Sequence, residues 1–309
     1  MKKVIYLAAV LLAAACQKEA LAPSLEGDTN VSFTIEIPVS EQTKATTVDM
    51  SAAAQTDIVY YEIWDSQWNK KLTKEVRSAE VKSGLASVDL KLVSGQTYNF
   101  VFWAQNKDCG AYDATDLQRV KINYSVIGDV KNNDKDVFDA FYAIDELTVV
   151  KGQKNEKTIT LKRPFAQLNF GALDEHMTTT FGKVDLGAST ITVSELATVF
   201  NAIKGEGENS VKEVSFNANG LATAEKLVVK DVEYNWLVMD YMLMMKSSDV
   251  VSVEASFNVG MEAPVEHSIP SVPLKKNYRT NIIGDLFTAG ATLEIKIDHA
   301  FAGEDNVTI

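Results

Sequence analysis

The sequence predicts an all-β protein with two β-sandwich domains in tandem and a few short helices. Three observations lead to this fold class. Apolar side chains recur at every second position in many short segments, which is the pattern of half-buried strands. Turn-forming residues separate these segments at roughly hairpin spacing. The chain of 309 residues is long enough for two domains after a short leader, and its 46% hydrophobic residues can form their cores.

The first sixteen residues have the pattern of an export signal. Lys2 and Lys3 precede an apolar run at residues 4–12, and three alanines then lead to Cys16. The run is too short to span a bilayer core, which needs roughly 20 residues. Because a cysteine directly follows small residues, the segment resembles the lipobox of bacterial lipoproteins, although Ala13 stands where leucine is usual.

We therefore expect residues 1–15 to be a lipoprotein signal peptide and Cys16 to carry the lipid, with a fatty acid such as palmitate. The lipid then replaces a transmembrane helix as the anchor. Plain secretion with an incidental cysteine is the alternative. Residues 16–29 are small, polar and charged, and we expect a flexible tether.

The first predicted strand lies at residues 31–37, where four apolar side chains alternate with polar ones. It ends before Pro38, which cannot donate a hydrogen bond to a sheet ladder, so we expect an edge strand. The other segments with a strand pattern are residues 58–64, 87–92, 98–104 and 158–161 in the first half, and 165–170, 189–193, 211–216, 227–229, 234–244, 250–259 and 293–297 in the second.

Short helices are expected at residues 115–119 and 194–203, because apolar residues of the second segment share one helical face. The joint between the domains is expected at Lys162-Arg163-Pro164. This division gives an N-terminal domain at residues 30–163 and a C-terminal domain at 164–309.

The charge balance excludes one class of partner. The chain has 42 acidic and 30 basic residues, a net charge of −12, and loss of Lys2 and Lys3 would make it −14 (28 minus 42). Such a surface repels phosphate backbones, so we expect no nucleic-acid partner. If Cys16 carries lipid, Cys109 has no partner for an internal disulfide. Cys109 is then either an unreactive loop cysteine or, less simply, a reactive thiol.

No pattern in the sequence indicates catalysis, a cofactor or a metal site. The sequence lacks a nucleophile elbow, a phosphate-binding glycine loop and a Cys-x-x-Cys pair. The three histidines lie far apart, at His176, His267 and His299. We expect that the protein is not an enzyme, unless the fold brings distant acids such as Asp240 and Glu254 together.

Three further patterns have a functional and a simpler explanation. The acids Asp298, Glu304 and Asp305 suit calcium, but a solvated charged terminus is the simpler explanation. The methionine-rich run at residues 239–245 suits an adaptable binding surface, but an ordinary core strand is simpler. Trp64 and Trp68 suit sugar stacking, but one buried and one loop tryptophan is simpler.

Five segments carry a resemblance to a known family. Residues 17–19 (QKE) are similar to an outer-surface export tag, residues 60–65 (YYEIWD) to an early strand, and residues 161–168 (LKRPFAQL) to the start of a C-terminal domain. Residues 273–286 (PLKKNYRTNIIGDL) are the most specific, and residues 295–301 (IKIDHAF) are similar to a last strand. Together they resemble the fimbrillin family, the type V pilins and related surface lipoproteins of the Bacteroidia.

This resemblance implies two transthyretin-like β-sandwich domains in a building block of cell-surface fimbriae. In such proteins a protease cuts after an arginine or lysine near the first strand, and loss of that strand opens a groove. A strand from another subunit fills the groove by sheet-edge pairing. Since head-to-tail contacts do not close on themselves, they build fibres.

Lys44 is the only basic residue between the first two predicted strands, so we expect the cut between Lys44 and Ala45. Residues 40–55 are polar and small, as in an exposed loop. An inert surface lysine is the alternative. Only residues 302–309 follow Phe301, which leaves little donor strand and favours a tip or accessory subunit over a stalk subunit.

The expected partners are therefore other fimbrial subunits, the outer membrane through the lipid, and host or bacterial surface ligands. The expected location is the outer membrane at the cell surface, or fimbriae after processing. The alternative function is that of a lipid-anchored surface carbohydrate-binding protein.

Overall fold

The computed structural model describes residues 25–38, 55–129, 135–174, 184–218, 226–260 and 263–298. The predicted lipidation site Cys16 and the predicted cleavage site at Lys44 and Ala45 lie outside these residues. The described part is nearly all β, which confirms the predicted fold class. No helix in these ranges has the length and apolar character that crossing a membrane requires.

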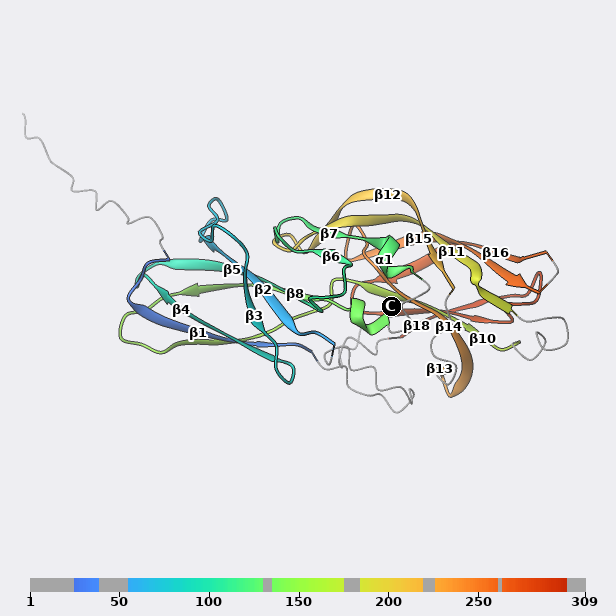
Figure 1. Ribbon diagram of the computed structural model, residues 1–309, viewed down its shortest axis with the longest axis horizontal. Helices are drawn as coiled ribbons and strands as arrows, with labels where there is room; N and C mark the ends of the chain where they lie inside the picture. The colour runs from blue at the N-terminus through green and yellow to red at the C-terminus, as the bar shows by residue number, and fades with distance from the viewer. Residues whose placement is uncertain are drawn as a thin grey trace, which may run out of the picture.

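The first lobe contains two sheets packed face to face (Figure 1). One has three strands in the order β4-β1-β9, and the other has four in the order β3-β2-β5-β8. Their apolar inner faces form the first core. The strands are β1 (Thr29–Glu36), β2 (Ile58–Asp65), β3 (Arg77–Glu80), β4 (Leu85–Leu92), β5 (Thr97–Gln105), β8 (Phe141–Thr148) and β9 (Asn155–Thr160).

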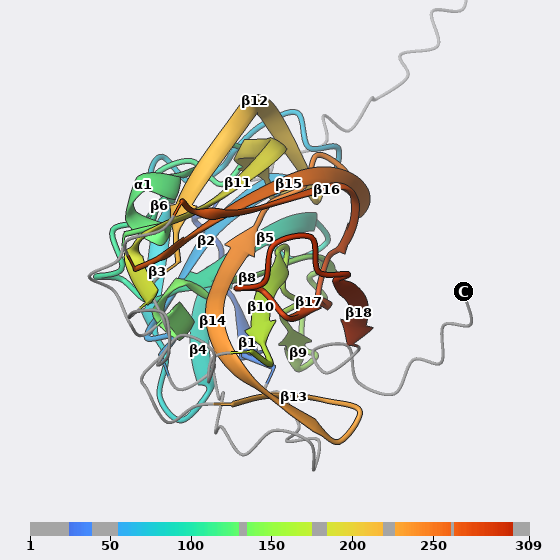
Figure 2. The same cartoon turned by 90° about the vertical axis from the view of Figure 1, so that its right-hand side faces the viewer.

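The second lobe is a larger sandwich, whose two layers are seen end-on in Figure 2. One sheet has the order β13-β14-β10-β17-β18 and the other β16-β15-β11-β7-β6, with β12 on the other side of β11. The strands are β6 (Tyr112–Asp113), β7 (Val120–Ile122), β10 (Ala166–Ala172), β11 (Val184–Asn201), β12 (Glu206–Asn217), β13 (Lys226–Val229), β14 (Val232–Met242), β15 (Ser248–Val259), β16 (Val265–Lys275), β17 (Arg279–Gly284) and β18 (Glu294–Asp298).

The chain leaves the first lobe between β5 and β8 and enters the second. Residues 106–129 and 135–140, which we call the insert, carry β6, β7, a short helix α1 (Tyr124–Ile127) and a 3₁₀ turn η2 (Lys135–Phe138). β7 pairs with β11, so the insert extends a second-lobe sheet although it precedes residue 164. In Figure 1 these elements lie with the second lobe.

Both helix predictions were wrong. Residues 194–201 belong to β11, where Glu195 has a φ of 57°. This irregularity interrupts the alternation, so buried Val193 and Leu196 are three positions apart, which imitates helical spacing. Residues 115–119 form successive turns instead. Asp113 accepts hydrogen bonds from the Thr115 backbone N–H and hydroxyl, which competes with helix formation.

Candidate functional site

β1 is the central strand of its sheet. It pairs antiparallel with β4 from Thr29↔Leu92 to Glu36↔Leu85, and parallel with β9 from Val31↔Asn155 to Glu36↔Thr160. The prediction of an edge strand was therefore wrong. The reason is that the ladders end at Glu36, so Pro38 lies beyond the last paired residue and costs no ladder hydrogen bond.

One face of β1 closes the first core. Val31, Phe33, Ile35 and Ile37 are at most 3% exposed. The Phe33 ring lies 4.5 Å from the Phe100 ring and 5.8 Å from the Phe102 ring, measured between centroids. Burial of four such side chains contributes on the order of 6–12 kcal/mol at about 1.5–3 each. The apolar face therefore adds a large contribution to the two backbone ladders that hold β1 in place.

Hydrogen bonds on the polar face and at the end of β1 also hold the strand. Two of them join a hydroxyl to a carboxylate, and one joins two backbone groups. The Ser32 hydroxyl donates to Asp89 Oδ1 at 2.5 Å, and the Thr160 hydroxyl donates to Glu36 Oε2 at 3.0 Å. The Ile37 N–H donates to the Gly84 carbonyl at 2.9 Å. No ion pair or disulfide involves a residue of β1 in the described part of the chain. β1 is thus held by non-covalent contacts and by its chain connections.

We call the position of β1 between β4 and β9 the β1 slot. Among the described strands, β4 and β9 each form a ladder with β1 alone. A strand in this slot must run antiparallel to β4 and parallel to β9. It must also present apolar side chains at alternate positions toward Phe100 and Phe102. The slot can therefore select both the direction and the pattern of its occupant.

The acid pair that an enzyme would need is not assembled. Asp240 on β14 is fully buried, and its Oδ1 lies 3.3 Å from the Nζ of buried Lys135. Glu254 on β15 is exposed and accepts a hydrogen bond from the Ser268 hydroxyl. The two carboxylates therefore face different surroundings in different sheets.

The remaining candidates have structural roles where the structure describes them. His267 is buried, with Nε2 2.8 Å from the Leu286 carbonyl oxygen, whereas His176 and His299 lie outside the described residues. No group of three metal-ligating side chains occurs within the described ranges. The residues of the methionine run that lie in β14 are buried, as in a core strand. Of the three terminal acids only Asp298 is described, at the end of β18.

The tryptophan pair and the cysteine are also largely enclosed. Trp64 is buried, and its Nε1 donates to Glu62 Oε2 at 3.1 Å, so only the half-buried Trp68 is left for stacking. Cys109 has a free thiol, and the residue is 8% exposed. Burial raises the pKa of this thiol above its usual value, which disfavours the reactive thiolate.

The burial of several charged side chains was not predicted from the sequence. Glu62, Lys135, Asp139, Arg163 and Asp240 are all at most 4% exposed. Burial raises the pKa of Asp240 to about 7, although Lys135 acts in the opposite direction. A charged residue within an otherwise apolar strand, as in Tyr-Tyr-Glu-Ile-Trp or Val-Met-Asp-Tyr-Met, was the available signal.

Fold and slot together define a two-lobe β-sandwich protein whose first strand is central and non-covalently held. A family model described as a family of unknown function (DUF6562) matches residues 23–309, and the chain belongs to this family. No curated protein matches the chain.

Several solved structures are similar over most of the chain. A proposed adhesin from Bacteroides thetaiotaomicron is 10% identical, with 90% of this chain and 98% of that chain covered and a TM-score of 0.49. The tip fimbrial protein Mfa3 from Porphyromonas gingivalis is 12% identical, with 87% and 98% covered and a TM-score of 0.44. A fimbrial assembly protein from Parabacteroides distasonis is 13% identical, with 87% and 98% covered and a TM-score of 0.44.

Proposed function

We propose that the chain is a fimbrillin-like surface lipoprotein and a structural or adhesive subunit of fimbriae. In this proposal β1 is the strand that another subunit replaces. The observation that carries it is the position of β1, which fills a slot between β4 and β9 without an ion pair or disulfide of its own in the described residues. Strand addition uses the main-chain groups and alternate pockets that such a slot offers.

The proposal includes release of β1 by proteolysis between Lys44 and Ala45. Lys44 is the only basic residue between β1 and β2 in the sequence. A cut there removes the covalent connection between β1 and the rest of the fold. The strand would then stay bound by its apolar face until another strand competes for the slot.

Attachment and domain division belong to the same proposal. Signal peptide 1–15, tether 16–29 and domains at 30–163 and 164–309 form the proposed organisation, in which the insert of the first domain adds β6 and β7 to a sheet of the second. The lipid on Cys16 is proposed to lie in the outer membrane at the cell surface. Within this proposal a tip or accessory role is preferred to a stalk role. Other fimbrial subunits and surface ligands are the proposed partners.

The test is limited digestion of the folded protein, produced without its leader, by a lysine-specific protease. We expect a stable fragment that begins at Ala45, and no such fragment from a Lys44→Ala variant. The cleaved protein should bind a synthetic peptide with the β1 sequence, and uncut protein should not.

A second peptide serves as the specificity control. A peptide with Phe33→Asp places a charge against the Phe100 and Phe102 rings, so it should fail to bind. Resistance of Lys44 to cleavage, or equal binding of both peptides, would contradict strand exchange in this slot.

A further inference from the structure

β5 is buried on both faces. Tyr98, Phe100, Phe102 and Ala104 belong to the first core, which β1 closes. Val101 and Trp103 belong to the second core, together with residues of the second lobe. The sheet β3-β2-β5-β8 is therefore not a simple sandwich layer, because its central strands lie between two cores.

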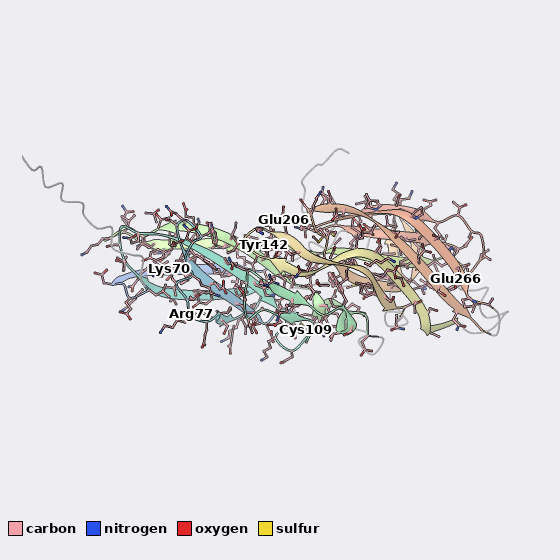
Figure 3. All side chains as sticks on the ribbon, turned by 90° about the horizontal axis from the view of Figure 1, so that it is seen from above. Lys70, Arg77, Cys109, Tyr142, Glu206 and Glu266 are labelled. Carbon is pink, nitrogen blue, oxygen red and sulfur yellow. The ribbon has the colours of Figure 1, made fainter. Side chains whose placement is uncertain are left out.

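The second lobe covers the outer face of this sheet with the end of β11 and the turn that follows it. The Phe200 ring lies 5.6 Å from the Trp103 ring and 4.7 Å from the Tyr142 ring, between centroids. The Lys276 ammonium donates to the Gly205 carbonyl, which holds the turn in place. Figure 3 shows Tyr142 of β8 next to Glu206 at the start of β12.

The insert covers the same face beside that turn. The Tyr112 ring lies 5.6 Å from the Trp103 ring. The backbone N–H of Leu117 donates to Glu62 Oε1 on β2 at 3.3 Å. Glu62 is fully buried and also accepts from Lys71 Nζ at 3.0 Å, so its negative charge is matched at the point where the insert meets the sheet.

Buried ion pairs fix the insert to the second lobe. The Asp139 carboxylate pairs with both Nε and Nη2 of Arg163, and Arg163 Nη1 donates to Asn277 Oδ1 at 2.9 Å. Lys135 on η2 pairs with Asp240 on β14, and both side chains are 0% exposed. Since separating a buried ion pair leaves an unpaired charge, the insert is not easily detached.

We infer that the second lobe keeps the sheet β3-β2-β5-β8 folded while the β1 slot is empty. Loss of β1 removes the ladder partner of both β4 and β9, so these three strands form the part that opens. The four-stranded sheet loses only one of its two buried faces, because Phe200, Tyr112 and the insert remain on the other. The inference rests on the proposed function in one respect, because it is the proposed function that has β1 leave its slot. The difference in stability between the two sheets does not require cleavage.

Hydrogen exchange on the uncut wild-type protein at increasing denaturant tests the inference. Amides of β1, β4 and β9 should open together, at a lower denaturant concentration than the amides of β5. Amides of β2 and β5 should open with those of β14 in the second lobe. Exchange of β5 together with β1 would overturn the inference.

A matched pair of substitutions tests the contact itself. Phe200→Ala removes the ring that covers Trp103 and Tyr142, so exchange of β5 amides should accelerate relative to β14 amides by roughly tenfold or more. Phe257→Ala removes an equally buried ring that contacts Phe170 within the second lobe, and should leave that ratio unchanged.

Unchanged exchange of the β5 amides in Phe200→Ala would also overturn the inference, because the Phe200 ring would then not hold the sheet. Neither experiment cuts the chain or adds a donor strand. A failure here therefore leaves the proposed function standing, and resistance of Lys44 to cleavage leaves this inference standing.

Discussion

The Phe33 and Phe100 rings lie 4.5 Å apart between centroids, the closest ring pair in the described part of the chain. Phe33 belongs to the first strand and Phe100 to the four-stranded sheet opposite. The contact therefore joins the strand that we propose to be exchangeable to the sheet that we infer to be permanent.

Phe33→Ala should lower the free energy of unfolding by about 3–5 kcal/mol, because it leaves a cavity beside Phe100 and Phe102. Urea unfolding of the uncut protein measures the change. Thr34→Ala is the control, since Thr34 points to the exposed face of the same strand, and it should change the free energy by about 1 kcal/mol or less. Similar losses for the two variants would show that the ring contact does not hold β1.

Asp240 should make the protein less stable as the pH rises from about 4 to 7. The pKa of its carboxyl is about 7 in the folded protein, against a usual value of 3.8. In that range the folded state keeps the proton that the unfolded state loses, so this group costs about 1.4 kcal/mol per pH unit. Below pH 4 both states are protonated, and the cost is absent.

The comparison of wild type with Asp240→Asn isolates this group. Asn cannot ionise, so the advantage of wild type over the variant should shrink between pH 5 and pH 7 in urea unfolding. Below the pKa of Asp240, Lys135 faces a neutral side chain in the wild type as well as in the variant, so the loss of this ion pair does not reverse the expected trend. A difference that stays constant with pH would contradict a raised pKa of Asp240.

Cys109 should react slowly with a thiol reagent in the folded protein and quickly in denaturant. Cys109 is buried, and burial raises the pKa of its thiol. A reducing agent should leave the melting temperature of the protein without its leader unchanged, since Cys109 is free. A downward shift of several degrees on reduction would indicate an intermolecular disulfide instead.

The strands were predictable because each one follows from the alternation of apolar and polar side chains within its own segment. Alternation at residues 31–37 reflects a face that packs on Phe100 and Phe102, and only the inner side chains had to be apolar. Trp64 and Trp68 were also assigned correctly, one to the core and one to a turn.

The central position of β1 was not predictable from its own residues. Its parallel partner β9 lies more than a hundred residues later, and the pairing of Val31 with Asn155 depends on the path of the whole chain. The insert posed the same difficulty, because residues 120 and 121 pair with β11 across the expected joint. The buried pair Lys135–Asp240 joins two such distant segments, so neither residue alone indicated the other.

Lipidation of Cys16 and cleavage at Lys44 together predict how the protein leaves the membrane. A cut after Lys44 leaves Cys16 and β1 on one peptide, residues 16–44, while the rest of the fold begins at Ala45. The part of the fold that begins at Ala45, which we call the body, should then stay in the membrane fraction. The reason is that β1 still fills its slot with four buried apolar side chains. A soluble peptide with the β1 sequence should compete for the slot and release the body.

Fractionation of membranes that carry the cleaved lipoprotein measures this release. The rate should rise with Phe33→Ala, which weakens the contact with Phe100 and Phe102. Cys16→Ser should be soluble before any cleavage, and Lys44→Ala should stay bound in the presence of peptide. Release by the protease alone would mean that β1 does not hold the body, and retention of Cys16→Ser would mean that the anchor lies elsewhere.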